Sequence, residues 1–229
     1  MSGAAIIQTE GITRDYPMGK AKIHALRGVS LSVSAGEFVT LMGASGSGKT
    51  TLMNILGCLD TPTGGSYFLE GREVSRLTKT ERAHLRNHRI GFIFQSFNLL
   101  PRLSALDNVV LPQLYQGKTD HSRQRAAQIL EKVGLADRVR HLPNELSGGE
   151  RQRVGIARAL VMNPAIILAD EPTGNVDSAT SAEIMKLLVA LSQEGVTILM
   201  VTHDREIAGY AHRVLHMRDG QILNESGGK

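Results

Sequence analysis

The stretch from Gly43 to Thr50 combines residue types and a spacing that can bind phosphate. It reads Gly-Ala-Ser-Gly-Ser-Gly-Lys-Thr and fits the pattern G-x-x-x-x-G-K-[ST] of a phosphate-binding loop. Its glycines let successive backbone N–H groups curl around one centre. Lys49 can reach the β- and γ-phosphates of a nucleotide, and Thr50 offers a hydroxyl to Mg²⁺. The candidate phosphate-binding residues are Gly43, Ala44, Ser45, Gly46, Ser47, Gly48, Lys49, Thr50 and Thr51.

The segments on both sides of this loop have the patterns that a phosphate-binding loop requires. Residues 37–42 are mostly apolar and have the pattern of a buried strand, and residues 51–56 have the composition of a helix. A helix start adds the positive end of its dipole at the phosphate position. A Gly/Ser-rich turn that binds nothing is the alternative, and the complete motif with both flanks argues against it.

Two adjacent carboxylates follow another apolar run. Residues 165–171 lie between Pro164 and Pro172 and form an apolar strand that ends in Asp170 and Glu171, which is typical of a buried parallel strand. Asp170 can hold Mg²⁺. Because strand side chains alternate, we expect Glu171 to point elsewhere, where it can take a proton from an attacking water.

Gln95 and His203 occupy comparable positions after the predicted strands at residues 90–94 and 196–202. Ligands of open α/β sheets bind at the carboxyl ends of the strands. The Gln95 amide can offer oxygen to a metal and contact a water, and His203 can reach a γ-phosphate. Taken alone, a polar strand end and a structural histidine are the simpler interpretations.

The sequence Leu-Ser-Gly-Gly-Glu-Arg-Gln at residues 146–152 predicts an unusual helix start. Ser147 and Glu150 have the spacing of a capping box. Gly148 and Gly149 in the first turn cost on the order of 1 kcal/mol each in helix stability. That cost is reasonable if bare backbone N–H groups must approach a phosphate.

Strand signals are absent from residues 96–144, and the pattern predicts a helical insertion over approximately residues 96–160. Ser104 and Asp107 mark one helix start, and Gly134 marks a helix end. Apolar residues crowd the entrance of this insertion. They can belong to the core or line a groove for a partner, and the sequence leaves both open for Phe97, Leu99, Leu100 and Pro101.

The N-terminal part predicts short strands over residues 6–33, with a turn near residues 17–19. Tyr16 precedes that turn. An aromatic ring there can stack on a purine, although an edge-strand tyrosine is the simpler local interpretation. Hairpin turns are predicted at residues 70–71 and 219–220.

Composition narrows the class of protein. The 229 residues are 41% hydrophobic and 21% charged, which is ordinary for a globular domain with a sizeable core. The net charge of +4 is not concentrated into a stripe, so no nucleic-acid partner is expected. Cys58 is the single cysteine, predicted to lie buried in the helix after the loop, and this excludes an internal disulfide. Neither a signal peptide nor an apolar run of about 18 residues is found.

In their order, these motifs resemble the ATP-binding-cassette (ABC) ATPases over nearly the whole chain. The matching stretches are the phosphate loop, Gln95, the family signature at 146–152, the strand and acids at 166–171, a D-loop at 174–177, and His203 as the switch histidine. Tyr16 is placed like the family's adenine-stacking aromatic. The resemblance implies a single α/β domain over residues 1–229. It would have a P-loop NTPase core, an N-terminal antiparallel β subdomain and the inserted helical subdomain.

Several short sequence stretches are similar to the lipoprotein-release and macrolide-export subgroup of these ATPases. The chain has Val176 where that subgroup usually has leucine. The resemblance implies ATP as substrate, Mg²⁺ bound by Thr50, Gln95 and Asp170, and catalysis by Glu171 with Gln95 and His203. It also implies a head-to-tail homodimer. In that dimer the phosphate loop of one copy would face Ser147, Gly148, Gly149 and Glu150 of the other.

The subgroup further implies an integral membrane permease as partner, docked near Phe97, Leu99, Leu100 and Pro101. The chain would then lie on the cytoplasmic face of the membrane. The alternative is a regulatory ATPase that controls a membrane partner in cell-envelope or division processes without a transported substrate. A nucleic-acid or ribosome ATPase is disfavoured, because the chain lacks the coiled-coil insertions, zinc cysteines or second cassette of those proteins.

Overall fold

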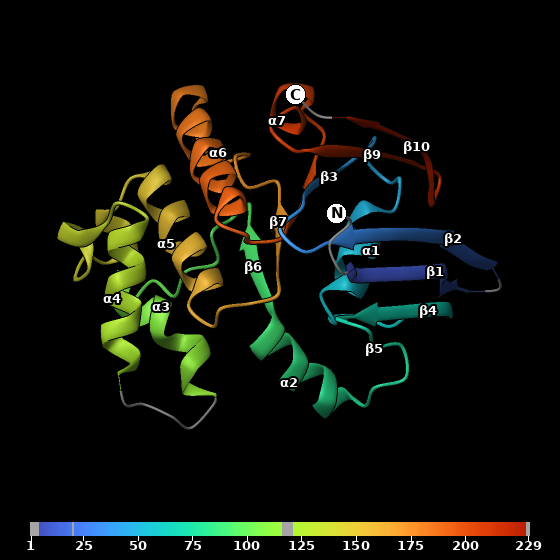
Figure 1. Ribbon diagram of the computed structural model, residues 1–229, viewed down its shortest axis with the longest axis horizontal. Helices are drawn as coiled ribbons and strands as arrows, with labels where there is room; N and C mark the ends of the chain where they lie inside the picture. The colour runs from blue at the N-terminus through green and yellow to red at the C-terminus, as the bar shows by residue number, and fades with distance from the viewer. Residues whose placement is uncertain (1–4, 20, 116–120, 228–229) are drawn as a thin grey trace.

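The computed structural model (Figure 1) describes residues 5–19, 21–115 and 121–227 and contains two β-sheets with helices around them. The larger sheet has the strand order β10-β9-β3-β8-β7-β6. Its parallel strands are β3 (Phe38–Met42), β6 (Ile90–Phe94), β7 (Ile166–Asp170), β8 (Ile198–Thr202) and β9 (Arg213–Arg218), and β10 (Gln221–Gly227) is the antiparallel edge. Every residue of β3 and β8 is buried, as expected for parallel strands covered on both faces.

The smaller sheet is antiparallel and has the order β2-β1-β4-β5. It consists of β1 (Ala5–Met18), β2 (Ala21–Ser34), β4 (Gly64–Leu69) and β5 (Arg72–Glu73). The prediction of short strands over residues 6–33 was wrong, because β1 and β2 each have 14 residues. Register shifts between them, for instance from Thr9 to Ile12, interrupt the side-chain alternation without ending the strands.

Both predicted hairpin turns are confirmed. Glu70 and Gly71 join β4 to β5 with φ of 51° and 74°, and Asp219 and Gly220 join β9 to β10 with φ of 49° and 78°. Two consecutive left-handed residues match the right-handed twist of the flanking strands, which explains a terminal glycine in each turn.

Helix α1 (Lys49–Leu56) lies between the two sheets. Leu52 and Leu56 are fully buried in one hydrophobic cluster that also contains Ile7 of β1 and Leu199 of β8. The prediction that Cys58 belongs to this helix was wrong. Gly57 ends the helix, and Cys58 follows in a left-handed turn with φ of 55°, where burial raises the pKa of its thiol to about 11.

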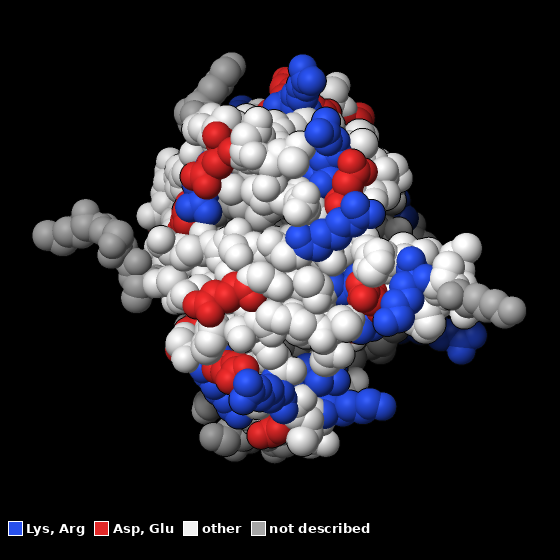
Figure 2. All heavy atoms as spheres, turned by 90° about the vertical axis from the view of Figure 1, so that its right-hand side faces the viewer, with Lys and Arg blue, Asp and Glu red and all other residues white. Residues whose placement is uncertain are grey.

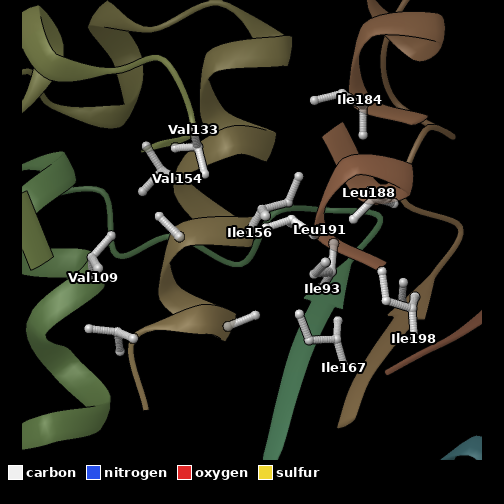
Figure 3. Close-up of a cluster of buried hydrophobic side chains, with 14 of the residues drawn as sticks. Ile93, Val109, Val133, Val154, Ile156, Ile167, Ile184, Leu188, Leu191 and Ile198 are labelled. Atoms are coloured by element: carbon white, nitrogen blue, oxygen red, sulfur yellow. The ribbon is translucent and has the colours of Figure 1, made fainter. Parts of the chain in front are cut away.

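The opposite face of the large sheet is covered by helices that share a second core (Figure 3). Ile93, Ile167 and Ile198 of the strands meet Ile156 and Leu188 of the helices in this core. The helices on this side are α3 (Ala105–Leu114), α4 (Ser122–Lys132), α5 (Gly148–Leu160) and α6 (Ser178–Gln193), with the 3₁₀ turns η1 (Ala136–Arg138) and η2 (Pro143–Glu145). Helix α7 (Arg205–Ala208) contributes Ile207 to the same core, whereas α2 (Lys79–Arg89) packs its buried Leu85 into the other hydrophobic cluster.

The predicted helical insertion corresponds to helices α3, α4 and α5, which the chain forms between the adjacent parallel strands β6 and β7. Residues 116–120 of this stretch lie outside the described residues. The helix starts at Ser104 and Ser147 are confirmed, since each side chain accepts the backbone N–H three residues later. On α6, Met185 is fully buried, whereas Leu187 is only partly buried.

Figure 2 shows the end of the molecule on which the antiparallel sheet lies, with basic and acidic side chains interspersed over it. Over the parts of the chain that the structure describes, no helix has the length and apolar character needed to cross a bilayer.

Strand β6 touches helix α5 so closely that only glycine fits at position 91. A Cβ atom on Gly91 would lie 2.6 Å from the backbone oxygen of Ala159. We therefore expect Gly91→Ala to destabilise the protein by about 1–3 kcal/mol, as overpacking does. Gly155→Ala on the same helix is the control, because its Cβ would meet its nearest neighbour at an ordinary 3.8 Å and should stabilise by up to about 1 kcal/mol. Denaturant midpoints of the two variants should move in opposite directions, and equal midpoints would contradict this packing.

Candidate functional site

The carboxyl ends of β3, β6, β7 and β8 meet at one edge of the large sheet and open into a cleft of about 990 Å³. This is the edge at which open α/β sheets bind ligands. The predicted residues that line the cleft are Ala44, Ser45, Gly46, Gly48, Lys49, Thr50, Thr51, Gln95, Asp170, Glu171 and His203. The structure therefore brings together most of the site that the sequence predicts.

The glycine loop fits only because two of its glycines lack side chains. Gly48 has φ of 101°, and a Cβ there would lie 2.6 Å from the backbone oxygen of Ala25 in β2. A Cβ on Gly43 would lie 2.2 Å from the backbone oxygen of Met217 in β9. The loop is thus packed between both sheets, with helix α1 starting at Lys49.

The Lys49 ammonium group lies inside the curl of the loop. Its Nζ donates hydrogen bonds of 2.8 Å to the backbone oxygens of Gly43 and Ala44, and one of 3.4 Å to Ser47 Oγ. Burial lowers the pKa of Lys49, against the opposing charges of Glu171 and Asp170. Within the described residues, Lys49 forms no direct ion pair with a carboxylate. An anion entering the loop would thus find a desolvated cation there.

Asp170 ends β7 and faces the same cleft. Its pKa is raised, first by burial and then by the negative charge of Glu171, while Lys49 lowers it. A cation beside Asp170 would relieve both effects.

Glu171 and Asp170 line the same cleft, and the predicted strand alternation does not set the direction of the Glu171 side chain, because β7 ends at Asp170. Glu171 lies beyond β7 and has a left-handed backbone with φ of 45°. Its N–H donates to the backbone oxygen of Val201 at 2.9 Å, which ties the turn to β8. Its carboxylate accepts a hydrogen bond of 3.2 Å from Thr202 Oγ1 and lies 2.7 Å from His203 Nδ1. The hydrogen bond to Glu171 raises the pKa of His203 above its ordinary value of 6.5.

Thr50, Gln95 and Asp170 supply a hydroxyl, an amide oxygen and a carboxylate to the same cleft. Oxygen donors with few carboxylates suit Mg²⁺ that is also bound by substrate phosphates. The described residues contain no cluster of three or more His, Cys, Asp or Glu side chains able to hold a metal by themselves. Asn175 Nδ2 donates to the backbone oxygen of Gln95 at 3.0 Å, which joins the end of β6 to the loop after β7.

Several predicted residues do not line this cleft. Ser47 is a buried residue of the loop, and Gly43 lines a neighbouring cleft of about 640 Å³. The signature residues Ser147, Gly148, Gly149 and Glu150 lie at the start of α5 and are not among the lining residues. Packing also explains the glycine at position 149, which the sequence did not reveal. A Cβ atom added to Gly149 would lie 2.4 Å from Thr180 Cγ2 of α6.

Tyr16 is likewise absent from the cleft lining. Its hydroxyl donates to Asp60 Oδ2 at 2.7 Å, and the Arg14 guanidinium lies 4.5 Å from the centre of its ring. Arg14 also pairs with Asp60 at 2.8 Å. The role of Tyr16 in stacking on adenine stays a prediction.

Sequence reasoning missed the part of the cleft wall that distant segments provide. These residues are Ile23, His24, Ala25 and Arg27 of β2, Val201 of β8, and the turn residues Asp219 and Gly220. The Arg27 N–H donates to the backbone oxygen of Gly220 at 2.9 Å, which places β2 beside the β9–β10 turn. No local pattern predicts this contact, although the Asp-Gly turn itself was recognised.

A strand, a glycine loop and a helix, with acids at the end of a neighbouring parallel strand, define a P-loop nucleoside-triphosphatase site. Comparison with known proteins gives the family. A family model described as ABC transporter matches residues 26–174. The YknY protein of Bacillus subtilis, an uncharacterized ABC transporter ATP-binding protein, is 51% identical over 225 residues and covers 98% of both chains. The chain belongs to the ABC transporter family.

Further relatives and solved structures agree. The macrolide export ATP-binding/permease protein MacB of Syntrophobacter fumaroxidans is 52% identical over 226 residues, which are 97% of this chain and 32% of that protein. The chain thus spans about a third of the MacB relatives it matches. The ATP-binding cassette MJ0796, solved as a dimer in a post-hydrolysis state with ADP and Pi, superposes with a TM-score of 0.88 at 42% identity and covers 97% of this chain and 99% of that one. The predicted family, subgroup and fold class are confirmed.

The contact between Glu171 and His203 predicts a measurable titration. Because the carboxylate stabilises the protonated imidazole, the ion pair is complete below the folded-state pKa of His203 and is lost as the pH rises through it. We expect Glu171→Gln to lower the His203 pKa toward 6.5, measured by NMR of the imidazole protons. An unchanged His203 pKa in the variant would contradict the contact.

Proposed function

We propose that this chain is the ATP-binding and ATP-hydrolysing subunit of a membrane transport or extrusion complex. The observation that carries the proposal is the single cleft in which Lys49, Asp170 and Glu171 meet at the strand ends. Phosphates would take the place of the loop carbonyls as partners of Lys49 and would accept hydrogen bonds from the N–H groups of the glycine loop. Tyr16 is proposed to stack on the adenine.

Hydrolysis in this site would depend on Glu171 as the general base. Its carboxylate would take a proton from the water that attacks the γ-phosphate. Thr202 and His203 orient that carboxylate through the contacts described above. His203, with 76% of its side chain exposed, can reach a terminal phosphate, and Gln95 would contact the same water.

Thr50, Gln95 and Asp170 would hold Mg²⁺, whose positive charge would offset the charge of the phosphates. The oxygen donor set and the raised pKa of Asp170 support this assignment. Asp170 would remain ionised in that state, because a bound cation favours its carboxylate form.

A second copy of the chain would complete the site. Ser147 is exposed at the start of α5 and lies outside the cleft of its own chain. Its N–H and Oγ are engaged with Glu150 in the capping box, and its hydroxyl proton could be donated to a nucleotide held by another copy. Gly148 and Glu150 would act with it, while Gly149 holds the turn against α6. The dimeric form of the MJ0796 cassette supports this arrangement.

The membrane partner would dock in an apolar groove of about 800 Å³ between α2, β6 and α5. Leu100 and Tyr115 both line this groove, and Leu100 has 48% of its surface exposed. Of the residues that the sequence left open between core and groove, Leu99 packs against the core and Leu100 lines the groove. Phe97 and Pro101 are absent from the lining, so their predicted part in docking finds no support.

The charges of the groove favour an acidic group on the docking segment. Arg86 and Arg158 line it together with His84 and His88, and no acidic residue is among the lining residues. Arg158 donates to the backbone oxygens of Phe97 and Asn98, and burial lowers its pKa. The name of the MacB relatives joins an ATP-binding part to a permease, which supports a permease partner here and a position at the inner face of the membrane. Export is the favoured process.

Glu171→Gln and Lys49→Ala should separate chemistry from binding. Glu171→Gln keeps the size of the side chain but removes the base, so hydrolysis should fall about 10²–10⁴-fold while ATP still binds and holds two copies together. Lys49→Ala should lose tight ATP binding and remain monomeric. Phosphate release and light scattering with Mg·ATP measure both properties. A Glu171→Gln protein that hydrolyses ATP at the wild-type rate would refute the role of Glu171 as general base. A Glu171→Gln protein that binds ATP but does not bring two copies together, even with the permease present, would refute the dimer.

Leu100→Glu tests the docking groove. A carboxylate on this groove wall would repel an acidic docking segment and place a charge against its apolar side chains, so it should reduce recovery of the membrane permease with the tagged chain about tenfold or more. Leu223→Glu on β10 is the matched control, since Leu223 is 52% exposed and lies outside the groove. Equal recovery of the permease with both variants would place the docking surface elsewhere.

A further inference from the structure

We propose that Gln152 is a positioning residue that ties helix α5 to the turn bearing Glu171, so that the placement of this helix sets the position of the general base. The proposal rests on the proposed ATPase function. Gln152 is fully buried in α5, and its Nε2 donates a hydrogen bond of 2.5 Å to the backbone oxygen of Pro172. Pro172 directly follows Glu171 in the chain.

The turn at Glu171 needs such support because its backbone is unfavourable for a residue with a side chain. Glu171 has φ of 45°, a conformation that persists only where surrounding contacts hold it. The Glu171 N–H is fixed to Val201 at 2.9 Å, and its backbone oxygen accepts from Gly174 N–H at 3.0 Å. Those two bonds come from the neighbouring strand and from the turn itself. Gln152 adds the one side-chain hydrogen bond that the described part of the inserted helices donates to this turn.

The same end of α5 also contacts the segment after Gln95. The Arg151 guanidinium lies 5.2 Å from the centre of the Phe97 ring. Ser147 caps this helix one turn before Gln152. A displacement at the exposed start of α5 would therefore act on Phe97 through Arg151 and on the Glu171 turn through Gln152. When the nucleotide of a second copy binds at Ser147 and Gly148, the resulting displacement of α5 would change the position of the general base through the hydrogen bond between Gln152 and Pro172.

Gln152→Leu is the first test, because leucine fills a similar buried volume but cannot donate to Pro172. We expect kcat for ATP to fall about 10-fold to 100-fold, the effect of a small misplacement of a catalytic group, with the ATP dissociation constant within about twofold of wild type. Gln113→Leu is the matched control. Gln113 is also a buried glutamine of the inserted helices, and its Nε2 donates to the backbone oxygen of Ser122 at 3.3 Å, away from the cleft.

Gln152→Glu supplies a readout that a purely structural role would not change. A protonated carboxyl group can donate to the Pro172 oxygen, whereas a carboxylate cannot and would repel it. Burial raises the pKa of such a carboxyl, so the ratio of variant to wild-type kcat should fall as the pH rises from about 6 to about 9. The same ratio for Gln152→Leu should not change with pH.

The assays use the chain in complex with its membrane permease, and wild-type hydrolysis is measured first. Loss of kcat in Gln152→Leu but not in Gln113→Leu, together with the pH dependence of Gln152→Glu, is the expected result. Wild-type kcat in Gln152→Leu, or an equal loss of kcat in Gln113→Leu, would overturn the role of Gln152 while leaving the ATPase assignment intact. No hydrolysis by the wild-type complex would overturn the proposed function itself.

Discussion

The structure depends on one constraint: the ammonium group of Lys49 must be held in a desolvated loop without a direct ion pair to a carboxylate. The three oxygens that surround Lys49 Nζ come from residues 43, 44 and 47 of its own loop. Asp170 and Glu171 act on Lys49 only through their charge. A cation held by neutral oxygens in this way retains its electrostatic attraction for an anion, whereas a direct ion pair would already have satisfied it.

The rest of the fold keeps this loop in place. Gly48 is packed against β2 and Gly43 against β9, so the antiparallel sheet and the edge of the parallel sheet both fix the loop. Helix α1 continues from the loop into the core between the sheets. The parallel register of β6, β7 and β8 then places Gln95, Asp170 and His203 at the same edge. A site for phosphates and a metal therefore follows from the order of the strands and the positions at which they end.

The features that local chemistry determines could be predicted from the sequence, and those that long-range packing determines could not. The capped helix starts at Ser104 and Ser147, the glycine turns, and the buried strands were all recognised, because each depends on neighbours within a few residues. The length of β1 and β2 was missed because register shifts hide their continuity. Ala25 and Gly220 were missed as cleft residues because only the packing of β2 on the β9–β10 turn brings them there. The left-handed backbone of Glu171 was missed for the same reason, because it depends on the contact of Glu171 with Val201 and on the hydrogen bond from Gln152 to Pro172.

The central claim is that the glycine loop and Lys49 recognise the outer phosphates of a nucleotide. Calorimetric titration of the wild-type chain with ATP, ADP and AMP in the presence of Mg²⁺ tests it most directly. Each charge-assisted hydrogen bond contributes about 1.5–3 kcal/mol, so loss of the β-phosphate should remove several such contacts at once. The account predicts that AMP binds at least about 100-fold more weakly than ADP or ATP. Equal affinity for AMP and ATP would mean that the nucleotide is recognised elsewhere and would contradict the account.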